Sequence, residues 1–549
     1  MGSRLEDGGM TSLTTGLILL RGGRVYTPAA PDATAMVVRG DTVEWVGTDS
    51  AAQVAYGDAA DQVIDLDGAL VTPAFVDAHV HLTSTGLALS GLDLAGCRSL
   101  AEALDRLARH AREHPGEVIC GQGWDETDWP EGRPPTRAEI DAAAGDALVY
   151  LSRVDVHSAV VSSALLAAAP GIQQADGYTE DGWLRREAHH IARRVARDAI
   201  TPGQRRVLQR AALRRAAELG IGALHECGGP EISGEDDFTD LLRLAGEEPG
   251  PEVYGLWGEL GAVDKAERLG AHAVAGDLCC DGAIGSRTAY LREPYADAPD
   301  TRGARYLTAG DVAEHLVACT RAGVQAGFHA IGDAALDAVV EGFAKAAQVV
   351  GEAALVAARH RVEHAEMADT DLIAAFARYG VIASVQPAFD AAWGGPDGMY
   401  ARRLGAERAL AMNPFAALAA AGVPLAFGSD APVTPLDPWG AIRAAVYHHN
   451  PDQRISARAA FTAHTRGGWR ALGRDTEGVL RPGAPATYAI WQVGELVVQA
   501  PDERIQAWST DPRSRVPGLP DLSPGVAPPR CLRTVVRGRI VYTREGALE

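Results

Sequence analysis

Apolar segments of strand length alternate with helix-like segments through much of this chain. The strand-like segments number eight and lie at residues 71–82, 221–225, 253–257, 272–280, 324–329, 361–364, 381–386 and 425–428. Helix-like stretches separate most of them, including 311–322, 334–350, 369–379 and 407–421. Eight alternating units are typical of a (β/α)8 barrel, whose parallel sheet closes on itself inside a ring of helices. A doubly wound open sheet is the alternative, but the count favours closure, so we expect an α/β protein with a TIM-type barrel.

The segments outside this alternation predict two further parts. Residues 16–70 and 477–545 hold short β-rich runs divided by Gly and Pro, and we expect both termini to pair into one small β-sandwich beside a barrel of residues 71–476. The segment of about residues 121–202 is too long for a loop, and strand-like and helix-like stretches do not alternate cleanly within it. It predicts an inserted subdomain after the first strand, near the barrel mouth.

Histidines and aspartates fall where the predicted strands end. On a strand, alternate side chains share one face, so a His-x-His pair at the end of the first strand points both rings the same way. Barrel enzymes carry their chemistry at the carboxyl ends of the strands, and imidazole and carboxylate are ligands of Zn²⁺. A single His-x-His pair also fits an ordinary turn. Histidines and aspartates at the ends of several strands together indicate a metal site. The residues concerned are His79, His81, Asp277, His329, His364 and Asp430.

Five short motifs at these strand ends resemble a known family. The chain is similar to the amidohydrolase superfamily and, within it, to amidohydrolase family 3, which includes enzymes that act on N-substituted formamides. The resemblance runs from about residue 16 to 541. The motifs that carry it are Pro73–His81, Asp281–Ala289, His329–Asp333, Glu363–Ala365 and Gly428–Val433.

The resemblance implies a divalent-metal centre. It assigns His79, His81 and Asp430 to the more buried ion, and it assigns His329 and His364 to a second ion. Many relatives bridge the two ions with a carboxylated lysine, but the matching position here is Asp277. Its carboxylate offers the same two oxygens on a shorter side chain. The sequence leaves three readings of Asp277 open: a bridge between two ions, a residue of a one-metal site and an ordinary hydrogen-bonded loop residue.

The predicted chemistry is metal-dependent hydrolysis of a non-peptide C–N bond of the amide or formamide type. We expect one or two divalent ions per chain, with Zn²⁺ as the natural candidate, and Asp430 as the catalytic residue that takes a proton from water and passes it to the leaving amine. One alternative is a deaminase or cyclic-amide hydrolase with a single ion. Another is a non-catalytic scaffold, which should have lost ligands that this chain retains.

Three further residues are candidates for substrate binding. Arg287 follows the Asp-Gly motif after the fourth strand, and an ion pair that braces this loop is its structural alternative. Trp124 and His157 lie in the predicted insertion, where ordinary packing is the alternative.

Net charge and cysteine content limit the classes of partner and the cellular compartment that the sequence predicts. A formal net charge of −21 argues against nucleic acid or an anionic membrane surface, which leaves a small-molecule substrate and a possible homodimer. Seven scattered cysteines do not form a disulfide framework, and no apolar run approaches the roughly 20 residues of a membrane span. With Glu6 and Asp7 ahead of any apolar run, the start is unlike a signal peptide. These features predict a cytoplasmic protein.

Overall fold

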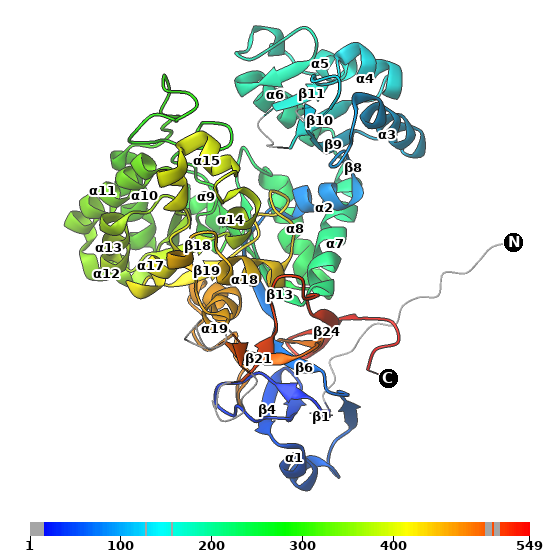
Figure 1. Cartoon of the computed structure of the whole chain (residues 1–549), viewed down its shortest axis with the longest axis vertical. Helices are drawn as coiled ribbons and strands as arrows, with labels where there is room; N and C mark the ends of the chain where they lie inside the picture. The colour runs from blue at the N-terminus through cyan, green and yellow to red at the C-terminus, as the bar shows by residue number, and fades with distance from the viewer. Residues whose placement is uncertain (1–15, 127–128, 155–157, 500–507, 510–516, 549) are drawn as a thin grey trace, which may run out of the picture.

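The computed structural model describes residues 16–126, 129–154, 158–499, 508–509 and 517–548. Three parts are visible in Figure 1: a central barrel, an inserted lobe above it and a β-rich part below it.

Eight parallel strands form the central sheet of the described chain, in the order β19-β18-β17-β16-β15-β14-β13-β7. The sheet closes between its first and last strands, where the Asp430 N–H donates to the His79 carbonyl at 2.8 Å and Val80 pairs with Ala431. A Cβ on Gly428 would lie 2.5 Å from the His79 nitrogen, so glycine permits this close approach. The predicted barrel is confirmed. Its strands are β7 (Phe75–Val80), β13 (Ile221–Gly228), β14 (Glu252–Trp257), β15 (Ala273–Val274), β16 (Gln325–Ala330), β17 (Arg361–His364), β18 (Ile382–Val385) and β19 (Leu425–Phe427).

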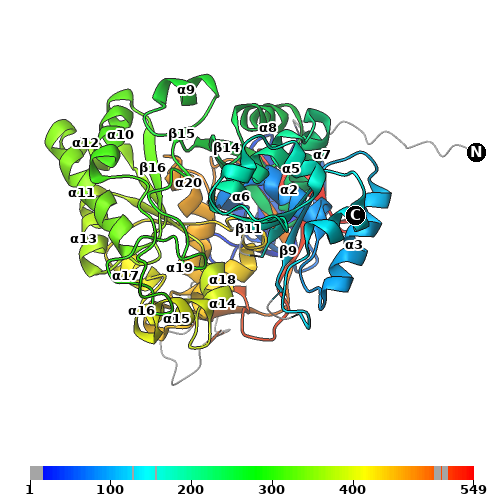
Figure 2. The ribbon, with the colours of Figure 1, turned by 90° about the horizontal axis from the view of Figure 1, so that it is seen from above.

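Helices cover the outside of the barrel, as the view from above in Figure 2 shows for α10 to α13. They are α2 (Leu82–Ser90), α7 (Pro202–Glu218), α8 (Glu235–Glu247), α9 (Val263–Arg268), α10 (Ala309–Ala322), α11 (Asp333–Val350), α12 (Glu352–Ala358), α13 (Thr370–Tyr379), α14 (Pro387–Trp393), α15 (Met399–Leu404), α16 (Ala406–Leu410), α17 (Phe415–Ala420), α18 (Pro438–Val446), α19 (Ala457–Thr462) and α20 (Gly468–Ala471).

The helix predicted over 407–421 is broken into α16 and α17. Pro414 has no N–H to continue a helix and disfavours helical geometry in the residue before it. That residue, Asn413, has a φ of 55° and donates its backbone N–H to the Glu366 carbonyl at 2.8 Å. The chain thus turns at this point.

Both termini build the β-rich part at the bottom of Figure 1. One sheet has the order β4-β3-β1-β5, and the other has the order β2-β6-β20-β24-β25. Their shared core joins Leu20 and Met36 near the start of the chain to Tyr488 and Val535 near its end, as predicted. The elements are β1 (Leu17–Arg21), β2 (Arg24–Val25), β3 (Ala35–Arg39), β4 (Thr42–Gly47), α1 (Asp49–Tyr56), β5 (Gln62–Asp65), β6 (Leu70–Pro73), β20 (Tyr488–Gln492), β24 (Arg530–Val536) and β25 (Arg539–Thr543), with β21 (Leu496–Gln499), β22 (Trp508–Ser509) and β23 (Leu519–Pro520) forming a small third sheet.

The inserted lobe has its own sheet, in the order β12-β11-β10-β9-β8. It starts at β8 and not at the expected residue 121, because Leu100 and Leu107 of α3 are buried in the core of the lobe. This helix begins with an N-cap, since Ser99 Oγ accepts a hydrogen bond from the Glu102 N–H at 3.2 Å. The lobe contains β8 (Leu92–Asp93), α3 (Leu100–Glu113), β9 (Ile119–Trp124), α4 (Arg137–Ala144), β10 (Val149–Arg153), β11 (Ser158–Val161), α5 (Ser163–Ala167), β12 (Trp183–Arg185) and α6 (Arg186–Asp198).

Among the described residues, no helix combines the length and the apolar character that crossing a membrane requires.

A buried histidine at the lower end of the barrel predicts acid sensitivity. His360 is fully buried, its Nδ1 accepts a hydrogen bond from the Ala326 N–H at 2.9 Å, and burial lowers its pKa to about 4. Because the folded state disfavours the charged ring, the stability that depends on neutral His360 is fully present above pH 6.5 and is lost as the pH falls toward 4. The loss corresponds to roughly 3 kcal/mol.

The measurement is the free energy of unfolding of metal-free protein at neutral pH and at a pH close to the lowered pKa of His360. The His360→Asn variant should lose less stability between these pH values than the unchanged protein does. His114 follows α3, and the His114→Asn variant is the control for the loss of an imidazole at another position. Equal losses in the unchanged protein and in His360→Asn would contradict this role.

Candidate metal centre

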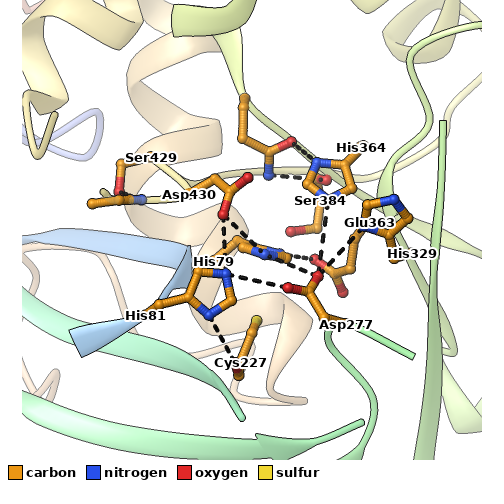
Figure 3. Close-up of polar contacts among 12 residues, drawn as sticks. His79, His81, Cys227, Asp277, His329, Glu363, His364, Ser384, Ser429 and Asp430 are labelled. Carbon is orange, nitrogen blue, oxygen red and sulfur yellow. Dashed lines mark hydrogen bonds and ion pairs between the residues drawn. The ribbon is translucent and has the colours of Figure 1, made fainter. Parts of the chain in front are cut away.

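The structure brings together all six residues that the sequence predicts as metal ligands. They converge at the carboxyl ends of the barrel strands, as Figure 3 shows. β7 carries His79 and leads into His81, and the loop after β15 supplies Asp277. The last two histidines and the second aspartate come from β16, β17 and the residues after β19; they are His329, His364 and Asp430.

Asp277 lies in the middle of this cluster. Its Oδ1 is 3.4 Å from His79 Nε2, 3.5 Å from His329 Nδ1 and 4.0 Å from His364 Nε2. Its Oδ2 is 3.2 Å from His81 Nε2. One carboxylate therefore faces two groups that could each hold an ion: one with His79 and His81, and one with His329 and His364.

Asp430 adds a second carboxylate on the side of the first pair. Its Oδ1 lies 3.1 Å from His81 Nε2 and 3.5 Å from His79 Nε2. Asp430 and His364 have φ values of 54° and 72°, which are uncommon for residues other than glycine. Such strained positions cluster at functional sites, where the surrounding structure holds them in place.

The second nitrogen of each histidine has an oxygen partner outside the cluster. His79 Nδ1 lies 2.9 Å from Glu363 Oε2, and His364 Nδ1 lies 2.7 Å from Gln386 Oε1. These acceptors keep the proton on Nδ1 and leave the Nε2 lone pairs free to bind a metal, as is usual for metal-bound histidines. The remaining contacts are His81 Nδ1 to the Cys227 carbonyl at 2.9 Å and His329 Nε2 to the Gly282 carbonyl at 3.4 Å.

The donor set fits a divalent cation. His79 Nε2 and Asp277 Oδ1 are buried, and neither makes a hydrogen bond to another residue in the described part of the chain. Buried polar atoms normally have a partner, and a cation between them would supply one. The mixture of imidazole nitrogen and carboxylate oxygen suits Zn²⁺ and similar ions.

Asp277, Asp430 and His364 have the ionisation states that a bound metal requires. Burial acts to lower the pKa of His79 and His81, but the nearby acidic groups outweigh burial and hold both pKa values well above the usual value, so a metal would displace a proton from these rings. Burial acts to raise the pKa of the Asp277 carboxyl, but His79 and the other imidazoles outweigh burial and hold that pKa well below its usual value. The same opposition leaves the pKa of Asp430 below its usual value. Burial, followed by the charge of His329, lowers the pKa of His364 to about 3. Both carboxylates are therefore ionised and the His364 ring is neutral at neutral pH.

None of the contacts described for the cluster involves the residues predicted to bind substrate. Arg287 forms an ion pair with Asp297, with Nη2 and Oδ2 2.8 Å apart, and so braces the loop after β15. Trp124 is fully buried in the lobe, where its Nε1 donates to the Leu151 carbonyl at 2.8 Å, so it offers no surface to a substrate. His157 lies outside the described residues.

The sequence reasoning missed the residues that hold the ligands in place. Glu363 precedes His364 in one of the motifs, and Gln386 ends the seventh predicted strand, so strand-end position was an available signal for both. Asp281 has a similar role, although the sequence marks it only as part of a motif. Its carboxylate accepts backbone hydrogen bonds from Ile331 and Gly332 at 3.0 and 2.8 Å, which ties the loop after β15 to the end of β16.

Comparison with known proteins supports the architecture. A protein from Arabidopsis thaliana, "Protein LONG AFTER FAR-RED 3", is 28% identical over 86% of this chain and 86% of its own length. An N-substituted formamide deformylase from Arthrobacter pascens is 24% identical over 85% of this chain and 91% of its own length. Among solved structures, an uncharacterized metal-dependent hydrolase from Pyrococcus furiosus superposes with a TM-score of 0.73 at 28% identity. That match covers 86% of this chain and 98% of the hydrolase.

The sequence profile of the amidohydrolase family matches residues 62–542, which include the barrel, the lobe and most of the β-rich part. The matched region contains every one of the six clustered histidines and aspartates. The chain is therefore a hydrolase that belongs to the amidohydrolase family.

Proposed function

We propose that this protein is a metal-dependent hydrolase that cleaves a non-peptide C–N bond of the amide or formamide type. The observation that carries the proposal is the position of Asp277, whose two oxygens face both groups of histidines. A carboxylate in this position is suited to bridge two ions, which is the role that the resemblance gives to a carboxylated lysine in many relatives.

The residues present suit two sites that share Asp277. His79 and His81, with the neighbouring Asp430, would hold one ion, and His329 and His364 would hold the other. An ion of this kind, Zn²⁺ being our proposal, lowers the pKa of water to about 7 and polarises a carbonyl oxygen.

We assign the proton transfer of the proposed reaction to Asp430. Its ionised Oδ1 borders both His79 and His81, so it is next to the place where water and substrate would meet. In the proposed reaction Asp430 takes a proton from water as the oxygen adds to the carbonyl carbon. It returns that proton to the nitrogen as the C–N bond breaks, and the products are a carboxylic acid and an amine.

The substrate class is tested with a panel of N-formyl and N-acyl amines. Protein loaded with Zn²⁺ is expected to release free amine from members of this panel, detected with an amine-reactive dye. Protein treated with a chelator, then dialysed, is the control and should release none. Release of ammonia from ring-amino compounds, with no amine from the panel, would contradict the proposal.

A single-ion hydrolase is the second candidate, because His79, His364 and Asp430 also form a compact group of their own. One ion at that position would leave His329 without a ligand role. This alternative predicts one ion per chain and favours deaminase-type or cyclic-amide substrates.

A further inference from the structure

A buried arginine lies below the metal centre and crosses the interior of the barrel. Arg361 and Glu363 occupy alternate positions on β17, so their side chains share one face of the strand, and both are fully buried. Arg361 Nε is 2.5 Å from Glu363 Oε1, and its Nη2 is 3.0 Å from Oε2. The two side chains thus form a two-pronged ion pair.

Further contacts of the guanidinium group connect this pair to three other strands. Arg361 Nη2 lies 2.7 Å from the Ala78 carbonyl on β7 and 2.9 Å from Ser384 Oγ on β18, so its two hydrogens are shared among these two acceptors and Glu363 Oε2. Its Nη1 donates to His225 Nδ1 on β13 at 3.1 Å. Arg361 therefore fixes the backbone of β7 at the residue immediately before His79.

Stability alone does not account for such a pair. Two charges taken out of water lose their hydration, and replacing a buried ion pair by apolar side chains of similar size is often neutral or stabilising. What this pair does provide is a fixed carboxylate whose Oε2 accepts a hydrogen bond from His79 Nδ1 at 2.9 Å.

Among the clustered histidines, His79 alone makes a hydrogen bond to a carboxylate through its outward-facing nitrogen, so far as the described residues show. The hydrogen-bond partners of the other three at this nitrogen are the Cys227 carbonyl, the Gln386 amide and the Gly282 carbonyl. Asp281 Oδ1 lies 3.9 Å from His329 Nε2, beyond hydrogen-bond distance. A carboxylate partner fixes the tautomer and the ring orientation and makes the other nitrogen a stronger metal ligand.

We propose that Arg361 and Glu363 form a positioning pair for His79 that sets the affinity of the ion held with His81 and Asp430. The inference rests on the proposed metal centre and assigns a separate supporting residue to each ion. Glu363 orients His79, a ligand of the first ion, and Gln386 orients His364, a ligand of the second.

The test measures metal affinity, independently of turnover. Metal-free protein is titrated with Zn²⁺ against a chromophoric chelator, and with Co²⁺ by its visible absorption spectrum. In Glu363→Gln the affinity for the first ion should fall by about 10- to 100-fold, with an altered Co²⁺ spectrum and little change for the second ion. The matched control, Gln386→Leu, should show the reverse pattern.

Two further variants keep the test decisive. The Arg361→Met, Glu363→Leu double variant removes both buried charges together and leaves no buried charge unpaired. It should therefore be folded by circular dichroism even if Glu363→Gln is not. Its affinity for the first ion should fall as it does in Glu363→Gln. The first site is assigned by repeating Glu363→Gln in a His329→Asn, His364→Asn background, which retains His79, His81 and Asp430.

Wild-type affinities and spectra in the folded Glu363 variants would overturn the positioning role while leaving the proposed function intact. Unchanged protein that binds no divalent ion would instead overturn the proposed function, and the positioning role with it.

Discussion

The Asp430→Asn substitution is expected to lower kcat by about 10²- to 10⁴-fold, because it removes the carboxylate that moves the proton. Asparagine keeps the size of the side chain and one of its oxygens, so the change acts mainly on proton transfer. The assay uses saturating Zn²⁺, with metal per chain measured on the same sample, so that lost turnover is not confused with lost metal.

A matched aspartate far from the cluster provides the control. Asp475 pairs with Arg359 at 2.6 Å on the surface of the protein, and Asp475→Asn should retain turnover. Full turnover in Asp430→Asn with the metal still bound would show that another group moves the proton.

The second large effect is expected for Asp277→Asn. The charge of Asp277 is shared between both groups of histidines. Its removal should weaken the binding of at least one ion by at least the roughly 10- to 100-fold that loss of a hydrogen-bond partner behind a ligand costs, and it should lower kcat/KM in parallel. Elemental analysis of the variant should give about one ion per chain or fewer. Two retained ions together with unchanged kcat/KM would exclude Asp277 as the bridge.

The sequence predicts the barrel well because its signals are local. Most barrel strands are apolar runs, β17 (Arg361–His364) being an exception, and each candidate metal ligand lies near the end of a strand. Hydropathy and residue type together therefore locate these strand ends. His329 and His364 illustrate this, since each lies at or near the end of a short parallel strand and both face Asp277.

The reach of Asp277 could not be predicted from sequence. β15 has only the residues Ala273–Val274, and the chain leaves the sheet three residues before Asp277. Whether a short carboxylate meets four imidazoles therefore depends on the path of an irregular segment, which has no sequence signature.

Other differences have similar physical causes. The two-residue strand β8 has no apolar pattern, so the inserted lobe begins earlier than expected. Trp124 is a candidate for substrate binding because it lies in an insertion, with ordinary packing as the alternative. A lobe of this size has a core of its own, and Trp124 packs against Trp183 within it. The sequence places Arg361 in a barrel strand but does not indicate which way its side chain points. Its contacts with Glu363 and with the Ala78 carbonyl show that it lies below the metal centre.

The most direct test of a bridged metal centre is the metal content per chain of protein purified without chelators. We expect elemental analysis to find about two divalent ions, and about one in Asp277→Asn. One ion in the unchanged protein would favour the single-ion candidate over the bridged pair. No ion, and no hydrolysis restored by Zn²⁺, Mn²⁺ or Co²⁺, would contradict the central claim that these histidines and aspartates form a catalytic metal centre.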